Sequence, residues 1–367
     1  MNLDIVIFGL SITTSWGNGH AATYRALAKA LHCRGHAVTF IERDAPWYRD
    51  NRDLKVSDYC RIELYDTLRD VPRRFGTLVA DADLVIAGSY VPDGATLADW
   101  ITRRARGVTA FYDIDTPVTL AGLDDGTTPY IAAALIPRFD LYLSFTGGPL
   151  LSVVEDVFGS PRARVLYCAA DIEPQPQSDH APRWALGYLG TYSADRQPGL
   201  ESFLLEPARA LRDEQFVVAG SQYPIGIAWP ANVARIEHLP QDQHAPFYGA
   251  QRYTLNVTRA DMRAAGFSPS VRLFEAAACG TPIVSDIWPG IETLFTPGKE
   301  ILLVDNMHQV IQLVSEMPEE RRRDIAAAAR RRLMRDHTPH HRACQLEGYY
   351  REVMAERPTG ARLEIVA

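Results

Sequence analysis

Strand-like and helix-like patterns alternate along almost the whole chain of 367 residues, and this alternation limits the fold more than any other feature. Short runs rich in β-branched and aromatic residues are typical of buried strands. In the first half these runs lie at 3–10, 36–42, 83–89, 107–113, 140–145 and 163–168. Helical periodicity separates several of them, as at 20–35. The alternation predicts a mostly parallel α/β sheet with helices on both faces.

A break in this pattern divides the chain into two parts. Residues 171–183 are rich in proline and polar residues and have no periodicity, as expected of an interdomain linker. Strand-like runs then resume at 184–190, 215–220, 235–239, 253–258, 281–286 and 300–305, and a long helical pattern covers 318–356. We therefore expect two doubly wound, Rossmann-like domains whose ligand-binding strand ends face a common cleft. The expected parts are a domain at 1–170, a domain at 184–340, and a C-terminal helix and tail at 341–367.

Composition excludes several classes of protein. The formal net charge of −7 argues against nucleic acid as a partner, because phosphates attract basic surfaces. The five cysteines are scattered and form no CxxC pair, which is typical of reduced thiols in a cytosol. The first residues contain no basic segment of a signal peptide, and no apolar run approaches the roughly 20 residues that span a bilayer. We expect a cytoplasmic protein.

The segment FSPSVRLFEAAACGTPIVSD at 267–286 places one carboxylate in an otherwise apolar helix. Ser268 and Pro269 are the expected N-cap and first residue, and the helix is expected to end near Cys279. Glu275 then lies near the middle. It either belongs to a solvated stripe or points into the cleft, where a carboxylate can accept hydrogen bonds from both hydroxyls of a diol.

This segment resembles the donor-binding segment of GT-B glycosyltransferases of the "glycosyl transferases group 1" type. It is most similar to the spore-maturation CgeB-type branch, of which SPSVRLFEA-ACG is a signature. The resemblance extends to YLGTYSADRQPGLESFL, VAGSQYP, FYGAQRYTLNVTRADM and, more weakly, WGNGHAATYRALAKALHCRGHAVTFIERD. It implies a GT-B fold, a nucleotide-sugar donor such as a UDP-, GDP- or dTDP-sugar, and Glu275 on the ribose hydroxyls. Many relatives contact the transferred sugar with a glutamate eight positions earlier. Phe267 stands there instead, which leaves the donor sugar and the stereochemical course open.

A diphosphate leaving group needs cations or oriented amides. In the related enzymes the loop after the first strand of the second domain carries basic residues that clamp the phosphates. Arg196 and Thr191 lie near those positions, and Arg259, at the end of a later strand, is a comparable candidate. The amides of Ser270 and Val271 would add the dipole of their helix. A surface position beside a neighbouring acid is the simpler alternative for Arg196.

The first domain contains a glycine-rich loop that opens a helix, SWGNGHAATYRALAKAL. Gly17 and Gly19 permit close approach of the backbone to a ligand. His20 follows, and in inverting GT-B enzymes a histidine at a comparable place is the general base. Asp113 or Asp115, at the end of the strand-like run 107–113, would orient it or contact the sugar. In a retaining transfer the departing phosphate takes the proton, and His20 matters only for positioning the reacting groups. The simpler alternatives are a capping or surface role for His20 and a loop-capping role for the two aspartates.

Other functions remain open from the sequence. GNGHAA matches the dinucleotide fingerprint G-x-G-x-x-A, with Glu42 ending the next strand, but it begins too far beyond the first strand. A nucleotide-sugar epimerase or hydrolase, or a non-catalytic sugar-nucleotide-binding partner subunit, would share the fold. No carboxylate pair is placed as in metal-dependent sugar transferases, so no metal cofactor is expected. The acceptor stays unidentified, whether small molecule, glycan or protein. The basic segment 319–337 is expected to be a solvated helix face, with a membrane-surface contact as the alternative.

Overall fold

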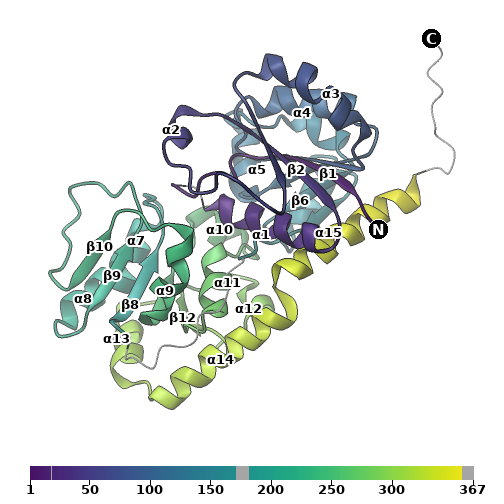
Figure 1. Cartoon of the computed structure of the whole chain (residues 1–367). Helices are drawn as coiled ribbons and strands as arrows, with labels where there is room; N and C mark the ends of the chain where they lie inside the picture. The colour runs from purple at the N-terminus through teal and green to yellow at the C-terminus, as the bar shows by residue number, and fades with distance from the viewer. Residues whose placement is uncertain (18, 171–181, 358–367) are drawn as a thin grey trace, which may run out of the picture.

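Two parallel β-sheets organise the chain, as the computed structural model in Figure 1 shows for residues 1–17, 19–170 and 182–357. The first sheet has the strand order β3-β2-β1-β4-β5-β6-β7, and the second has the order β10-β9-β8-β11-β12-β13. The strands are β1 Asp4–Phe8, β2 Ala37–Arg43, β3 Arg61–Tyr65, β4 Leu84–Gly88, β5 Val108–Asp113, β6 Leu141–Ser144, β7 Ala163–Val165, β8 Trp184–Leu189, β9 Phe216–Ala219, β10 Val233–Ile236, β11 Gln251–Asn256, β12 Ile283–Ser285 and β13 Leu302–Leu303. Both sheets are doubly wound, as the alternating pattern predicted.

Helices cover both sheets. The N-terminal domain carries α1 His20–Cys33, α2 Pro46–Arg49, α3 Val71–Asp81, α4 Gly94–Arg104, α5 Thr116–Asp124 and α6 Leu150–Asp156, with short 3₁₀ segments η1 Leu68–Asp70 and η2 Ala133–Arg138. The C-terminal domain carries α7 Gln197–Leu200, η3 Glu201–Leu205, α8 Glu206–Ala210, η4 Gln241–Gln243, α9 His244–Gly249, α10 Ala260–Ala265, α11 Val271–Ala278, α12 Ile291–Leu294 and α13 Met307–Glu316. The chain ends in α14 Glu319–Asp336 and α15 Pro339–Glu356.

Every predicted strand-like run overlaps a strand, and one strand was missed. The central strands are apolar along their whole length, as in β4 and β9, where every residue is buried. Burial on both faces of a parallel sheet explains why they read as continuous hydrophobic runs. The missed strand, β3, has the sequence RIELY and lies at the edge of its sheet, where only Tyr65 is buried. The predicted linker lies outside the described residues, apart from residues 182 and 183.

The last two helices connect the domains. The helical pattern at 318–356 is interrupted before Pro339, because the Thr338 side chain caps α15 in a capping box with His341. The C-terminal helix therefore begins slightly earlier than expected. In Figure 1, α14 runs beneath the C-terminal domain, where it packs on α11, and α15 returns to the N-terminal domain, where it packs on α1 and β5. Arg34 donates to Glu347 of α15 at 2.5 Å.

The basic helix α14 pairs four of its seven arginines with its own acids. Glu319 accepts hydrogen bonds from Arg322 and Arg323, and Asp336 forms ion pairs with Arg332 and Arg335. These pairs favour the solvated-face interpretation of this segment. Within the part of the chain that the structure describes, no helix combines the length and the apolar character needed to cross a membrane.

Candidate active site

A pocket of about 510 Å³ lies between the two domains. It is bordered by loops that follow the carboxyl ends of strands in both sheets, where doubly wound sheets bind their ligands. Ten of the eleven predicted site residues line it: Gly17, Gly19, His20, Asp115, Thr191, Arg196, Arg259, Ser270, Val271 and Glu275. Asp113 does not. The pocket therefore brings together candidates from two domains that are up to about 250 positions apart in sequence.

The charges in the pocket differ from those of the whole molecule. Its lining contains three arginines, three histidines and two carboxylates, namely Arg196, Arg259, Arg272, His20, His238, His244, Asp115 and Glu275. The chain as a whole carries a formal charge of −7. A cationic concavity on an acidic protein concentrates anions. The pocket is thus suited to an anionic ligand of the size of a nucleotide sugar.

Glu275 is buried in the middle of α11 and has two partners from α9. The Tyr248 hydroxyl donates to its Oε2 at 2.9 Å, and His244 Nδ1 lies 3.0 Å from its Oε1. Burial alone would raise the pKa of Glu275, but His244, Tyr248 and Arg272 together lower it below its usual value. Burial likewise opposes the charge on His244, and the Glu275 carboxylate outweighs it and raises the pKa of that imidazole. Each carboxylate oxygen can accept two hydrogen bonds, so Glu275 keeps acceptor capacity for a ligand.

The helix that carries Glu275 begins two residues later than expected. Ser270, not Ser268, is its N-cap residue, and the first helical residue is Val271. Ser268 is used elsewhere, since its hydroxyl lies 2.8 Å from that of Thr146 in the other domain. Consequently the first-turn amides at Ser270 and Val271 border the pocket, and such amides attract anions.

The two predicted phosphate-binding arginines differ in their surroundings. Arg259 lies between two carboxylates, with Nη1 3.4 Å from Asp115 and Nε 3.5 Å from Asp195. Arg196 donates from Nη2 to the Thr191 carbonyl at 2.8 Å, its buried Nε has no hydrogen-bond partner, and no described carboxylate pairs with it. The simpler alternative for Arg196, an ion pair with the neighbouring Asp195, is not formed: Asp195 pairs with Arg259 and acts on Arg196 only at longer range. Of the two arginines, Arg196 is the less neutralised.

His20 and Asp115 meet at the pocket wall of the N-terminal domain. The Tyr90 ring stacks on His20, with centroids 5.7 Å apart and planes 27° apart, and the Tyr90 hydroxyl donates to Asp115 Oδ2 at 2.8 Å. Burial lowers the pKa of His20, Asp115 opposes this effect, and Arg259 adds to it. This lowered pKa favours the neutral imidazole, the form that a general base requires.

Asp113 lies behind the pocket in a closed polar network. It is fully buried and accepts hydrogen bonds from the Tyr142 hydroxyl, from Thr119 Oγ1 at 2.8 Å and from the Asp115 amide at 3.2 Å. Burial raises the pKa of Asp113 to about 6, although these donors counteract it. The expected contact with His20 or a sugar is thus replaced by a contact with the Asp115 backbone, because β5 ends with Asp113 facing the core.

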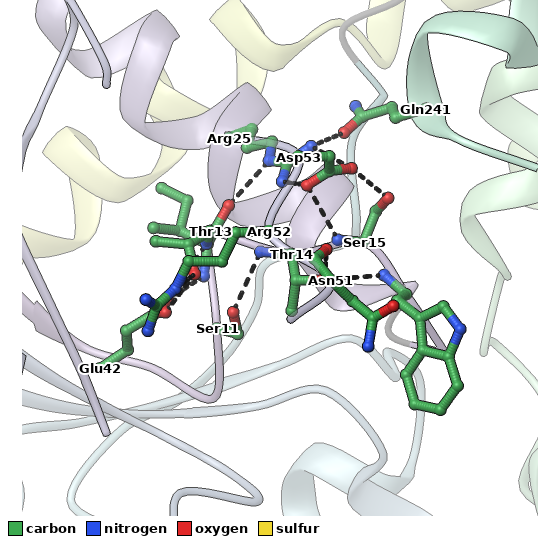
Figure 2. A network of polar contacts seen from close by, with 12 residues as sticks. Ser11, Thr13, Thr14, Ser15, Arg25, Glu42, Asn51, Arg52, Asp53 and Gln241 are labelled. Carbon is green, nitrogen blue, oxygen red and sulfur yellow. Dashed lines mark hydrogen bonds and ion pairs between the residues drawn. The ribbon is translucent and has the colours of Figure 1, made fainter. Parts of the chain in front are cut away.

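The loop after β1 is fixed by two polar clusters, one buried at Glu42 and one partly exposed at Asp53 (Figure 2). Glu42 accepts from the amides of Ile12, at 2.6 Å, and Thr13, at 3.2 Å. Behind the glycine-rich segment, Arg25 forms a salt bridge with Asp53 at 2.5 Å and reaches Gln241 of the other domain at 2.7 Å. Glu42 is therefore committed to holding the loop, which removes the acidic residue that a dinucleotide fingerprint needs.

Phe267 occupies the position at which related enzymes have a sugar-binding glutamate. Its backbone is left-handed, with φ 50°, and its ring fills the space beside Gly148 and Gly290. Its carbonyl accepts from the Gly147 amide of the other domain at 2.9 Å. It does not line the pocket. Phe267 therefore joins the domains and contributes no polar group to the pocket.

The structure adds site residues that we did not predict. Gln241, His238 and His244 line the pocket, and Tyr248 holds Glu275 from behind it. One available signal was the spacing of four between His244 and Tyr248, which places both on the same face of a helix. The position of Tyr90 had no such signal.

Comparison with known proteins finds one matching family model and many solved structures of similar fold. Residues 196–348, which include the Glu275 helix, match the family described as "Glycosyl transferase-like". Three solved structures are similar over 96% of this chain. The first is a sucrose-phosphate synthase from Thermosynechococcus elongatus, with 15% identity, a TM-score of 0.69 and 99% of that chain covered. The second is Anabaena HepE with UDP and glucose, with 14% identity, a TM-score of 0.67 and 100% of that chain covered. The third is an α-glucosyltransferase with UDP and a DNA 13-mer, with 12% identity, a TM-score of 0.70 and 100% of that chain covered. The fold is GT-B.

The predicted GT-B architecture is thus confirmed by the solved structures. The expected class of protein, a glycosyltransferase, is confirmed at the level of the matched family. No curated protein shows significant sequence similarity to this chain. The DNA in the third structure belongs to that protein, and at 12% identity the likeness concerns the fold alone.

Proposed function

We propose that this protein transfers a sugar from a nucleotide-diphosphate sugar to an acceptor hydroxyl in the interdomain pocket. The observation that carries the proposal is the composition of that pocket. It places Glu275, a carboxylate with acceptor capacity, and Arg196, a cation without a carboxylate partner, opposite His20 and Asp115 of the other domain. A ribose, a diphosphate and a reacting hydroxyl need these three kinds of group.

In this proposal the donor domain binds the nucleotide part. Glu275 accepts hydrogen bonds from the ribose hydroxyls, as the resemblance to group 1 enzymes implies. Arg196 and the amides of Ser270 and Val271 bind the diphosphate, and Arg259 contributes less because two carboxylates already neutralise it. The solved structures of HepE with UDP-glucose and of a glucosyltransferase with UDP-glucose support a UDP-sugar as the first donor to test.

The N-terminal domain would supply the acceptor-side chemistry. The lowered pKa of His20 favours its neutral form, and both His20 and Asp115 contact Tyr90. His20 can therefore take the proton of the attacking hydroxyl in an inverting transfer. In a retaining transfer the departing phosphate would take this proton, and His20 would only position the acceptor. The anomeric configuration of the first-formed product, measured by proton NMR, distinguishes the two.

Four finer expectations belong to the same proposal. The CgeB-like branch and a hexosyl donor rest on the signature around Glu275. Metal independence rests on the use of Arg196 and helix amides for the leaving group, and turnover that persists in EDTA would support it. A cytoplasmic setting is supported by the five cysteines, all of which are free thiols. The presence of both His20 and Asp115 at the pocket favours an enzyme over a non-catalytic binding subunit.

A thermal-shift screen with nucleoside diphosphates and their sugars tests the proposal. A ligand at 100 times its Kd stabilises the folded state by about 2.7 kcal/mol, which raises the melting temperature measurably. We expect one nucleoside diphosphate and its sugar to give the largest shifts, followed by nucleotide release when acceptors are added. No shift with any nucleotide would contradict the proposal.

A further inference from the structure

Tyr90 has a backbone conformation that aromatic residues rarely adopt. It follows β4 and has φ 63°, in the left-handed region that favours glycine. A bulky side chain pays a conformational cost there, and such strain persists where the surrounding structure imposes it. The local sequence offers no glycine at this position, so the side chain itself must account for the conformation.

The Tyr90 side chain contacts both acceptor-side residues of the pocket. Its ring stacks on His20 at the start of α1, with centroids 5.7 Å apart. Its hydroxyl donates to Asp115 Oδ2, after β5, at 2.8 Å. One side chain thus joins two residues that different elements bring to the pocket wall.

Tyr90 is itself supported from the core. The Tyr130 ring packs on it, with centroids 4.7 Å apart, and the Tyr130 hydroxyl lies 2.8 Å from Thr119 Oγ1. Thr119 donates in turn to Asp113, which accepts the Asp115 amide. The contacts therefore run from Tyr90 through the core and back to the backbone of Asp115.

We propose that Tyr90 is a positioning residue for the transfer reaction, whose hydroxyl orients Asp115 and whose ring fixes His20. The left-handed backbone is the conformation in which one ring reaches both. This inference rests on the proposed glycosyl transfer, in which His20 and Asp115 face the acceptor. Misplacement of reacting groups by about 1 Å can reduce a rate 100-fold.

Tyr90→Phe tests the hydroxyl while keeping the ring. With the nucleotide sugar that the thermal-shift screen selects, we expect kcat to fall roughly 10- to 100-fold and the Kd of the nucleoside diphosphate to change less than twofold. Tyr349→Phe is the matched control, because Tyr349 also loses one hydrogen bond of 2.8 Å, to the Val165 carbonyl, outside the pocket. Equal, small effects of the two variants on kcat would overturn the proposal.

Tyr90→Leu tests the ring without any substrate. The charged groups that act on the pKa of His20 are Asp115 and Arg259, and Tyr90 contributes its stacked ring. Burial is the largest cause of the lowered pKa of His20, so removing the ring should raise that pKa, whereas Tyr90→Phe should leave burial intact. Imidazole NMR titration measures this in the ligand-free protein. An unchanged His20 titration in Tyr90→Leu would refute the positioning role, whereas the absence of turnover in the wild type would refute the proposed function and leave this readout intact.

Discussion

Replacing Glu275 with glutamine removes the charge of a buried carboxylate that serves two purposes in the structure. Toward the pocket it is the proposed acceptor for two ribose hydroxyls. Toward the protein it binds His244 at 3.0 Å and Tyr248 at 2.9 Å. The two purposes predict different losses, so a set of variants can separate them.

For ligand binding, losing the charge-assisted bonds to a diol costs about 2–4 kcal/mol, which weakens Kd roughly 30- to 700-fold. For folding, removing one partner of a buried ion pair costs about 3–5 kcal/mol when the other partner stays charged. His244 can escape part of this cost by losing its proton. The folding penalty of Glu275→Gln should therefore depend on pH, and the binding penalty should depend on it less.

The sign of the pH dependence follows from the raised pKa of His244. A group whose pKa is higher in the folded state adds stability that is fully present below its unfolded value of about 6.5. This stability is lost as pH rises through the folded value. The melting temperatures of wild type and Glu275→Gln should thus differ most below pH 6.5, while Glu275 remains ionised, and should converge at higher pH.

Isothermal titration with the nucleoside diphosphate and its 2′-deoxy analogue supplies the decisive measurement. His244→Asn and Tyr248→Phe are the matched controls, because they weaken the support of Glu275 and keep its carboxylate. We expect them to lower the melting temperature and to reduce affinity less than tenfold. Wild-type affinity in Glu275→Gln, or equal binding of the deoxy analogue, would refute the ribose assignment.

Three further predictions follow from the geometry of the pocket. In titration calorimetry, Arg196→Ala should weaken binding of the nucleoside diphosphate about 10- to 100-fold and leave binding of the bare nucleoside unchanged. Arg259→Ala should weaken diphosphate binding less, because Asp115 and Asp195 already neutralise Arg259. Equal losses of affinity for both ligands would mean that Arg196 supports the fold. His20→Ala should lower kcat by about 10² to 10⁴ with the nucleotide Kd intact if His20 is the base, and a wild-type rate would remove it from the chemistry. Gly220→Ala should lower the melting temperature through a cost above about 1 kcal/mol, because φ is 144° and the added Cβ would lie 2.0 Å from the Gly190 carbonyl oxygen; an unchanged temperature would contradict this steric argument.

Local patterns were enough to predict most of the fold, and the resemblance of two short segments to a known family predicted much of the candidate pocket. Glu275 and Arg196 each lie in such a segment, and the strand ends place them at one edge of a sheet. The edge strand β3 was missed because its charged residues obscure the pattern of a buried strand. Asp113 was misplaced because Asp113 and Asp115 both lie at the end of β5, and only burial tells them apart.

The contacts that complete the site could not be predicted from the sequence, because they join separate segments. Asp115 meets Arg259 across the two domains, and Arg25 meets Gln241 in the same way. Neither pair is marked by a periodicity or a fixed spacing in the sequence, because its geometry depends on how the domains pack. The pocket carboxylate of each domain nevertheless has a cationic partner, and for Asp115 that partner lies on the opposite domain. The acceptor-side charge of this pocket is therefore fixed only when both domains are in place, so each domain by itself would lack part of the site.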